Sequence, residues 1–271
     1  MDDRYDAGPV ESGRVRGAEL IRTPSAWHRF PAGVLRRGIG RTRVPVSLGD
    51  GIEIMADLDT NLGIRAYRYR SWRLLEPTIA EVRRRLAPGQ VFVDGGANIG
   101  LFTLYGALAV GASGRVVAFE PAFGAIRELT ENVRLNGFDW VEIARVALSD
   151  RAGLQDFVDL GHASGFSSFA PKQSGGTRIS VSTIRLDDAV PAPEVVGMVK
   201  LDLEGAEVAA LRGAPRLLAA GVPFIVEIEH EHLQRQGATA SEVYELFTSA
   251  GYRWRGLPPG PNVLFESGTS R

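Results

Sequence analysis

The sequence predicts an α/β protein with a mostly parallel central sheet, helices on both faces of that sheet, and an antiparallel closing strand. Two patterns support this fold class. From residue 91 onwards, short apolar segments alternate with segments in which apolar residues recur at helical spacing. The short segments are continuously apolar, which is typical of strands buried on both faces in a parallel sheet.

The expected elements can be assigned in chain order. A hairpin is predicted over 44–55, turning at Gly49-Asp50-Gly51, and a short helix from Glu76-Pro77 to Leu86. Strands are then predicted over 91–94, 116–119, 141–147, 195–202 and 223–229, with closing strands at 252–254 and 263–265. Helices are predicted over 99–110, 123–136 and 205–220, and after a capping box of Thr239 and Glu242. Residues 150–190 interrupt the alternation and predict an antiparallel excursion.

Three regions are expected along the 271 residues. Residues 1–45 contain nine arginines without clear periodicity, so we expect a flexible or cap-forming arm. Residues 46–88 hold the N-terminal hairpin and helix, and residues 89–271 form the ligand-binding domain.

Charge and composition narrow the class of protein. The formal net charge of -1 gives no global field that would attract nucleic acid or an acidic membrane surface. There are no cysteines, which excludes disulfides, thiolate nucleophiles and cysteine zinc sites. The N-terminus lacks the apolar stretch of a secretory signal, so a soluble, cytoplasmic protein is expected. The N-terminal segment leaves a homodimer open, but no feature specifies one.

A glycine-rich turn is predicted to form the main binding motif. The segment Asp94-Gly-Gly-Ala-Asn-Ile-Gly100 joins a strand to a helix, where small residues let backbone N–H groups approach a ligand. Glu120 follows Gly100 by 20 residues at the end of the next strand, where a carboxylate can bind the ribose hydroxyls of a nucleoside. A dinucleotide fingerprint would need glycine in place of Ala97, and Asp94 would repel a pyrophosphate. The amino group of a methionine moiety suits Asp94 better, which favours S-adenosylmethionine over NAD.

Several ordered segments together resemble the FkbM family of S-adenosylmethionine-dependent methyltransferases. These segments are Val91–Thr103, Phe119-Glu120-Pro121, Val146–Asp150, Lys200–Glu207, Glu227–His230 and Gly251-Tyr252. The resemblance implies a Rossmann-like class I methyltransferase fold. It also implies O-methylation of a hydroxyl on a sugar, polysaccharide or natural product, with a small-molecule or saccharide acceptor.

The resemblance also implies, position by position, which residues bind the cofactor. Asp94, Gly96, Asn98 and Gly100 would frame the methionine end, Glu120 the ribose, and Pro121 and Ala147 the adenine, with Glu76 also close to the cofactor. Gly95 departs from the family pattern, in which this slot usually holds a branched apolar residue. This difference should loosen the end of the strand without removing a ligand group.

Residues at the ends of two later strands are the candidates for catalysis. A hydroxyl acceptor must be aligned with the methyl group and must lose its proton. Asp202 is predicted to face the methyl group or the acceptor, although it could instead cap the helix starting at Gly205. Lys200 is expected to pair with a carboxylate inside the sheet, either as a purely structural contact or as one that tunes the pKa of that carboxylate. Glu229, which alternation places on the same face as Glu227, and His230 are further candidates for the base, although His230 could instead lie in a solvated loop.

A metal site is left open. Asp202, Glu229 and His230 could meet as oxygen and imidazole ligands of Mg²⁺ or Mn²⁺. Proximity in the sequence does not show that the side chains converge, so no metal ligand is assigned.

Three other functions also stay open. N-methylation of a small molecule or peptide would use the same cofactor. An NAD-dependent oxidoreductase would need the missing middle glycine and a Tyr/Lys pair for hydride transfer, which the sequence does not show. A non-catalytic binding module would keep the nucleoside site and serve a partner.

Overall fold

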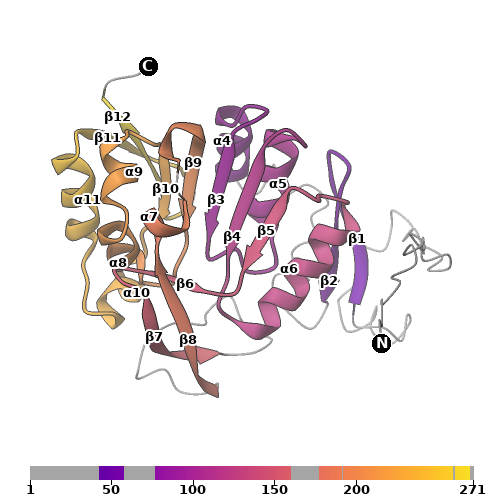
Figure 1. Ribbon diagram of the computed structural model, residues 1–271, viewed down its shortest axis with the longest axis horizontal. Helices are drawn as coiled ribbons and strands as arrows, with labels where there is room; N and C mark the ends of the chain where they lie inside the picture. Colours follow the sequence, from indigo (N-terminus) through magenta and orange to yellow (C-terminus); the bar gives the residue numbers. More distant parts are fainter. Residues whose placement is uncertain (1–42, 58–76, 160–176, 191, 259, 269–271) are drawn as a thin grey trace, which may run out of the picture.

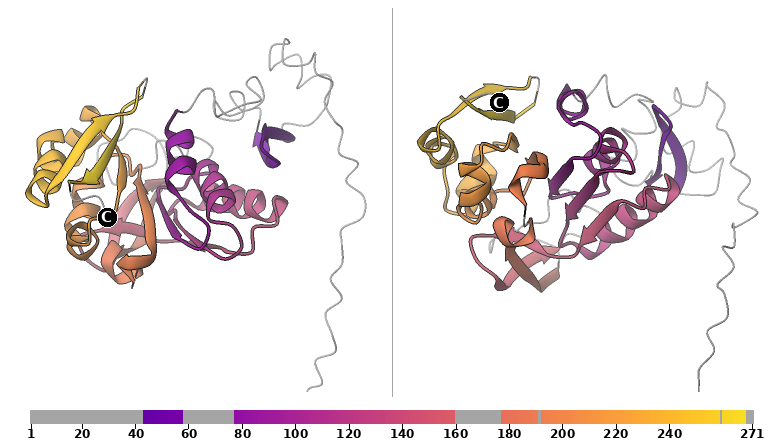
Figure 2. Two further views of the ribbon diagram at one scale, coloured as in Figure 1. Left: turned by 90° about the horizontal axis from the view of Figure 1, so that it is seen from above. Right: turned by 45° about the horizontal axis from the view of Figure 1, so that its top comes forward.

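The protein is built around a seven-stranded sheet (Figures 1 and 2). The computed structural model describes residues 43–57, 77–159, 177–190, 192–258 and 260–268. From one edge of the sheet to the other, the strands are β11 (Tyr252–Gly256), β12 (Asn262–Ser267), β10 (Phe224–Glu227), β9 (Val196–Leu201), β3 (Val91–Gly95), β4 (Arg115–Phe119) and β5 (Val141–Ala144). Strands β10, β9, β3, β4 and β5 pair in parallel, whereas β12 is antiparallel to β10 and β11. The predicted parallel sheet with an antiparallel closing strand is confirmed.

Helices cover both faces of this sheet. They are α4 (Pro77–Arg85), α5 (Leu101–Val110), α6 (Phe123–Leu135), α7 (Leu186–Ala189), the 3-10 helix η3 (Pro193–Val195), α8 (Glu207–Arg212), α9 (Pro215–Ala219), α10 (His230–Arg235) and α11 (Ala240–Ser249). Within the described ranges, none of the helices has the length and apolar character needed to cross a membrane.

Alternate residues of the central strands fill two separate cores. Val93 and Val199 pack with apolar side chains of α8, α9 and α11 on one face. Phe92 and Met198 pack with α4 and α5 on the other face. Successive strand residues point to opposite faces, so a strand covered on both sides must be apolar throughout.

The N-terminal hairpin forms as predicted. β1 (Arg43–Gly49) pairs with β2 (Ile52–Asp57) in antiparallel fashion and lies beside α6 (Figure 1). Ile52 and Ile54 are buried in a third core together with Leu129 of α6. The hairpin therefore packs on the helix that follows β4.

Two asparagines of α6 bind the outer edge of this hairpin. Oδ1 of Asn136 accepts the Glu53 N–H at 2.9 Å, and Oδ1 of Asn132 accepts the Met55 N–H at 2.8 Å. The amide of Asn136 also donates to the Glu53 carbonyl at 2.7 Å. These bonds satisfy strand groups that no other strand reaches within the described part of the chain.

A second, smaller sheet forms the predicted antiparallel excursion. β8 (Thr177–Arg185) pairs antiparallel with β7 (Gly153–Asp159) and parallel with β6 (Ala147–Ser149). The single strand predicted over 141–147 is wrong, because it divides between β5 and β6, which belong to different sheets. The division follows a tight turn, in which the Val146 N–H donates to the Ala144 carbonyl at 2.9 Å.

The helix predicted over 205–220 is also divided, into α8 and α9. Gly213 ends α8, and Pro215 begins α9 because proline lacks the N–H that a helix interior requires. A Cβ at Gly213 would lie 2.3 Å from the Ser149 carbonyl oxygen, so the break also lets the chain pass close to β6.

The C-terminal part contains one helix that the sequence did not indicate. Strand β10 ends at Glu227, two residues before its predicted end, and α10 begins at His230, which was considered for a solvated loop. The next helix, α11, starts at the predicted capping box, in which Thr239 and Glu242 bond each other's backbone N–H groups. Helix α10 contributes one side chain, His232, to the candidate active site.

Candidate active site

A cavity opens at the carboxyl edge of the parallel strands, where open α/β sheets bind their ligands. It is lined by Gly96, Asn98, Phe119, Glu120, Pro121, Val146, Ala147, Leu148, Phe157, Asp202, Leu203, Glu204, Ala206 and Glu227. Glu120 follows β4, whereas the other acidic residues follow β9 or end β10. Since β3 lies between β4 and β9, Glu120 and the remaining carboxylates occupy opposite ends of the cavity.

The turn after β3 holds two chain segments in close contact. Gly96 has a φ of 76°, and a Cβ on it would lie 1.8 Å from the Asp202 carbonyl oxygen. No other residue type fits this position without moving one segment. The contact is reinforced by the Asp202 N–H, which donates to the Gly95 carbonyl at 3.0 Å. The glycine-rich turn thus positions Asp202 in the cavity.

Glu120 connects the first two turns of the site. Its Oε2 accepts the Asn98 N–H and its Oε1 accepts the Ala122 N–H, both at 2.8 Å. Burial raises the pKa of Glu120 to about 7, although the two backbone hydrogen bonds act in the opposite direction. Each carboxylate oxygen keeps a second lone pair. Glu120 can therefore still accept hydrogen bonds from the hydroxyls of a ligand.

Asp94 is buried and is not among the residues that line the cavity. It is only 1% exposed, and Thr103 donates its hydroxyl to Oδ2 at 2.5 Å. Burial raises the pKa of Asp94, and the charge of Lys200 opposes this effect. Oδ1 has no hydrogen-bond partner within the described part of the chain. A buried carboxylate oxygen without a donor fits a positively charged ligand group such as an amino acid ammonium.

Lys200 forms the ion pair that its position in the sheet predicts. Its Nζ lies 2.9 Å from Oδ2 of Asp202 and 4.3 Å from the centre of the Phe102 ring. Burial alone would lower the pKa of Lys200, but the charges of Asp202 and Asp94 raise it. Burial alone would raise the pKa of Asp202, but Lys200 lowers it. Both members of the pair are therefore charged at neutral pH.

Two further carboxylates are crowded against this pair. Glu227 hydrogen bonds to Asp202, and its pKa is raised to about 10 by burial and by the Asp202 charge. The pKa of Glu204 is raised to about 8 by burial and by the charges of Asp202 and Glu207. Like charges at such short range disfavour each other's ionisation. At neutral pH Asp202 is ionised while Glu227 holds a proton.

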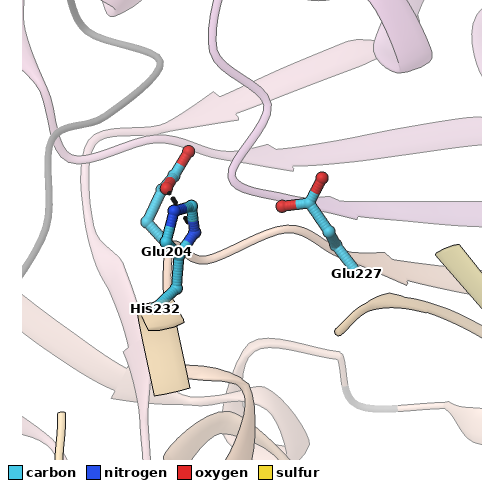
Figure 3. A group of neighbouring side chains, drawn as sticks. All are labelled: Glu204, Glu227 and His232. Atoms are coloured by element: carbon cyan, nitrogen blue, oxygen red, sulfur yellow. Dashed lines mark ion pairs between the residues drawn. The ribbon is translucent and has the colours of Figure 1, made fainter. Parts of the chain in front are cut away.

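The loop after β9 directs Glu204 towards α10. Glu207 ties this loop, because its Oε1 accepts the N–H groups of Leu203 at 2.7 Å and Gly205 at 3.3 Å. Oε2 of Glu204 lies 2.8 Å from Nδ1 of His232, in the first turn of α10 (Figure 3). Burial and the charge of Arg235 lower the pKa of His232, so its imidazole is neutral at pH 7. Glu207 itself braces the loop, as expected for an acid in the first turn of a helix.

Most residues predicted to bind the cofactor line this cavity. Gly96, Asn98, Glu120, Pro121 and Ala147 do so, while Gly100, at the N-cap of α5, and the buried Asp94 do not. A Cβ at Gly100 would lie 2.6 Å from Leu129 Cδ1, so this glycine permits the packing of α5 on α6. Glu76 falls outside the described residues.

Glu229 and His230 do not face the cavity. Both are exposed, and neither is among the lining residues. The alternation expected to keep Glu229 on the same face as Glu227 stops because β10 ends at Glu227. The proposed meeting of Asp202, Glu229 and His230 is not found among the described side chains.

Three other side chains converge instead: Glu204, Glu227 and His232. Glu204 and Glu227 were visible in the sequence as acids at strand ends, but only the exact strand length decides which acid faces the cavity. His232 could have been found only if the start of α10 had been predicted, because the helix turns this residue back towards the sheet.

Comparison with known proteins assigns the family. Residues 94–254, more than half of the chain, match the methyltransferase FkbM domain. The chain belongs to the FkbM methyltransferase family. The matched region begins at Asp94 and includes every described acidic residue of the cavity.

Individual FkbM-family and methyltransferase relatives are distant. Methyltransferase sdnD of Sordaria araneosa is 28% identical over 153 residues, which cover 45% of this chain and 59% of sdnD. The chain thus matches less than two thirds of the length of that relative. The crystal structure of methyltransferase FkbM from Methylobacillus flagellatus has 16% identity and a TM-score of 0.46, covering 72% of this chain and 59% of that one. M. jannaschii TYW2 in complex with AdoMet has 14% identity and a TM-score of 0.44, covering 84% and 87%. Identities and TM-scores this low indicate nothing about the acceptor.

Proposed function

We propose that this FkbM-family chain is an S-adenosylmethionine-dependent methyltransferase that methylates a hydroxyl of a small-molecule or saccharide acceptor, in sugar, polysaccharide or natural-product biosynthesis. One observation carries the proposal: Glu120 and the Lys200–Asp202 ion pair line or border the same cavity from opposite sides of β3. A carboxylate suited to ribose hydroxyls and a charged pair suited to an acceptor are thereby held about two strand spacings apart, roughly 10 Å.

The cofactor end of the proposed site is formed by the turns after β3 and β4. Glu120 would accept hydrogen bonds from the ribose hydroxyls of the cofactor. Pro121 and Ala147 would border its adenine, and Gly96 and Asn98 would border its methionine end. The unpartnered Oδ1 of Asp94 supports a positively charged group nearby. Under this proposal, residues 89–271 form the cofactor-binding domain.

The catalytic end would be formed by Asp202 and Lys200. When bound, S-adenosylmethionine supplies an electrophilic methyl group on a sulfonium. An acceptor hydroxyl attacking in line forms the new C–O bond as the C–S bond breaks, and its proton must leave. Asp202 is ionised and lines the cavity, so it would receive that proton. Lys200 would hold the Asp202 carboxylate in place through their 2.9 Å contact.

Calorimetric titration tests the cofactor. S-adenosylhomocysteine should bind the purified chain, and NAD should not. Glu120→Ala should weaken binding of S-adenosylhomocysteine at least tenfold, because it removes the charge-assisted bonds to the ribose. Tight NAD binding with no response to S-adenosylhomocysteine would refute the proposed function.

Turnover of a methylated acceptor tests the catalytic end. Asp202→Ala should retain S-adenosylhomocysteine binding and lose most of the turnover with any acceptor found in a screen of hydroxylated compounds. Full activity in Asp202→Ala would remove this residue from the mechanism. A product methylated on nitrogen would favour the N-methyltransferase alternative over O-methylation.

A further inference from the structure

Two carboxylates and one imidazole converge at the catalytic end of the cavity, which is called its acceptor end from here on because the methyl acceptor would bind there. Glu204 lies in the loop after β9, Glu227 ends β10, and His232 lies in the first turn of α10. One potential ligand atom from each lies within 4.8 Å of the other two. Figure 3 shows the Glu204 carboxylate against the His232 ring, with the Glu227 carboxylate across from them. The three side chains come from three separate elements.

The backbone fixes each member of this group independently. Glu204 has a left-handed φ of 53°, and its loop is held by the two hydrogen bonds to Glu207. Gly205 lets α10 approach, since a Cβ there would lie 2.3 Å from the His232 carbonyl oxygen. Glu227 is held in the sheet by its position at the end of β10. The convergence therefore rests on packing between elements and not on neighbouring positions in the chain.

The local charges favour a bound cation. Asp202 lies against the group and already pairs with Lys200 at 2.9 Å. Glu204 and Glu227 add two more acidic groups, and the cationic side chains acting on them are Lys200 and, for Glu204, Arg235. Lys200 is one positive charge shared among three acidic groups, so Glu204 and Glu227 can both ionise only if further positive charge is bound, and a divalent cation would supply it.

The ligand set indicates the class of cation. Carboxylate oxygens with one imidazole nitrogen suit Mn²⁺, Fe²⁺ or Zn²⁺, whereas Mg²⁺ prefers oxygen ligands alone. Ligand atoms bound to one ion at about 2.0–2.2 Å lie roughly 3–4 Å apart. Small side-chain rotations would close the present separation to that range.

We propose that Glu204, Glu227 and His232 bind a divalent transition-metal cation at the acceptor end of the cavity. Three protein ligands leave coordination positions open. The cation would therefore take oxygen atoms of the acceptor, which points to acceptors with two neighbouring oxygens, such as vicinal hydroxyls. The location of this site relative to an acceptor rests on the proposed function, but the binding of the metal itself does not.

Mn²⁺ binding to the full chain tests the proposal directly. Titration followed by electron paramagnetic resonance, with and without S-adenosylhomocysteine, should show one site that binds Mn²⁺ more tightly than Mg²⁺. His232→Gln and Glu227→Gln should each weaken Mn²⁺ binding at least tenfold. His230→Gln is the matched control, because His230 is exposed, lies on the same helix and is not part of the group. It should bind Mn²⁺ like the unmodified chain.

The outcomes separate the metal site from the proposed function. No saturable Mn²⁺ binding, or equal losses in His230→Gln and His232→Gln, would overturn the metal site. Glu120→Ala should lose S-adenosylhomocysteine binding and keep Mn²⁺ binding. Mn²⁺ binding without any S-adenosylhomocysteine binding would instead refute the methyltransferase proposal and leave the metal site standing. Circular dichroism of each variant shows whether it is folded, and Glu204→Gln serves as a third ligand variant should one of the others not fold.

Discussion

The contact between Gly96 and the Asp202 carbonyl leads to a quantitative prediction. Replacing Gly96 with alanine places a methyl group where the structure leaves 1.8 Å to that oxygen. The left-handed φ of 76° adds a second penalty, about 1–2 kcal/mol for a residue with a Cβ. Forcing the two segments apart costs about 1–3 kcal/mol more, as in other overpacked sites. Gly96→Ala should therefore lower the free energy of unfolding by about 2–5 kcal/mol.

Gly251→Ala provides the matched control. Gly251 has a φ of 80°, close to that of Gly96, but a Cβ there would meet nothing within 4 Å. This variant should lose only the backbone contribution, about 1–2 kcal/mol. Urea denaturation at pH 7 gives both values, and the difference between the two variants isolates the steric contact. Equal losses in the two variants would refute the close approach of the turn to Asp202.

Three other predictions follow, two from ionisable side chains and one from a helix cap. Because the pKa of Glu120 is raised to about 7, its side chain is mostly protonated at pH 6 and mostly ionised at pH 8, and only the ionised form can accept hydrogen bonds from the ribose with both oxygens. Calorimetry should therefore show S-adenosylhomocysteine binding about tenfold more weakly at pH 6 than at pH 8. Burial opposes ionisation of Glu81, but its hydrogen bonds to Arg84 and Arg85 lower its pKa from 4.5 to about 2. The ionised Glu81 carboxylate therefore stabilises the folded protein fully above pH 4.5, and this stabilisation is lost as the pH falls towards 2. Glu81→Gln should lower the free energy of unfolding by about 1–3 kcal/mol at pH 7, and by less at pH 3, in urea denaturation. Thr239→Ala should cost about 1 kcal/mol in the same measurement, because it removes the cap of α11.

Each of these predictions has a clear contrary result. Glu120→Gln cannot titrate, so its binding curve should be flat between pH 6 and pH 8, and a retained slope would assign the effect to another group. If the loss of stability in Glu81→Gln did not depend on pH, it would arise from packing and not from the charge of the Glu81 carboxylate. A Thr239→Ala variant as stable as the parent chain would mean that the capping box contributes nothing.

The parts of the fold that follow local rules could be predicted from the sequence. The strand that contains Asp94, the glycine turn and the Thr239 cap each depend on residues close together in the chain, and each is present in the structure. Pro215 carried the signal for the divided helix, but the apolar periodicity around it favoured one continuous helix. The end of β5 at Ala144 had no such signal, because no glycine or proline follows it and apolar residues resume at Val146 after Arg145.

The acceptor end depended on information that the sequence does not carry locally. Lys200 and Asp202 could be paired because they lie two residues apart at the end of the predicted strand 195–202, where alternation places their side chains on the same face. Glu227 and His232 could not be joined to Glu204, since their meeting depends on how α10 packs across Gly205. Because β10 ends two residues earlier than predicted, Glu227 and not Glu229 lies in the site.

The two asparagines of α6 also determine the alignment of the N-terminal hairpin. Asn132 and Asn136 are one helical turn apart, about 6 Å along the axis, and Glu53 and Met55 are two strand residues apart, about 6.7 Å. The helix therefore meets successive outward N–H groups of β2 much as a neighbouring strand would. A shift by one residue would present N–H groups that point towards β1, leaving both amides without these partners. A side of the hairpin that could otherwise recruit a strand from another molecule is thereby sealed by a helix.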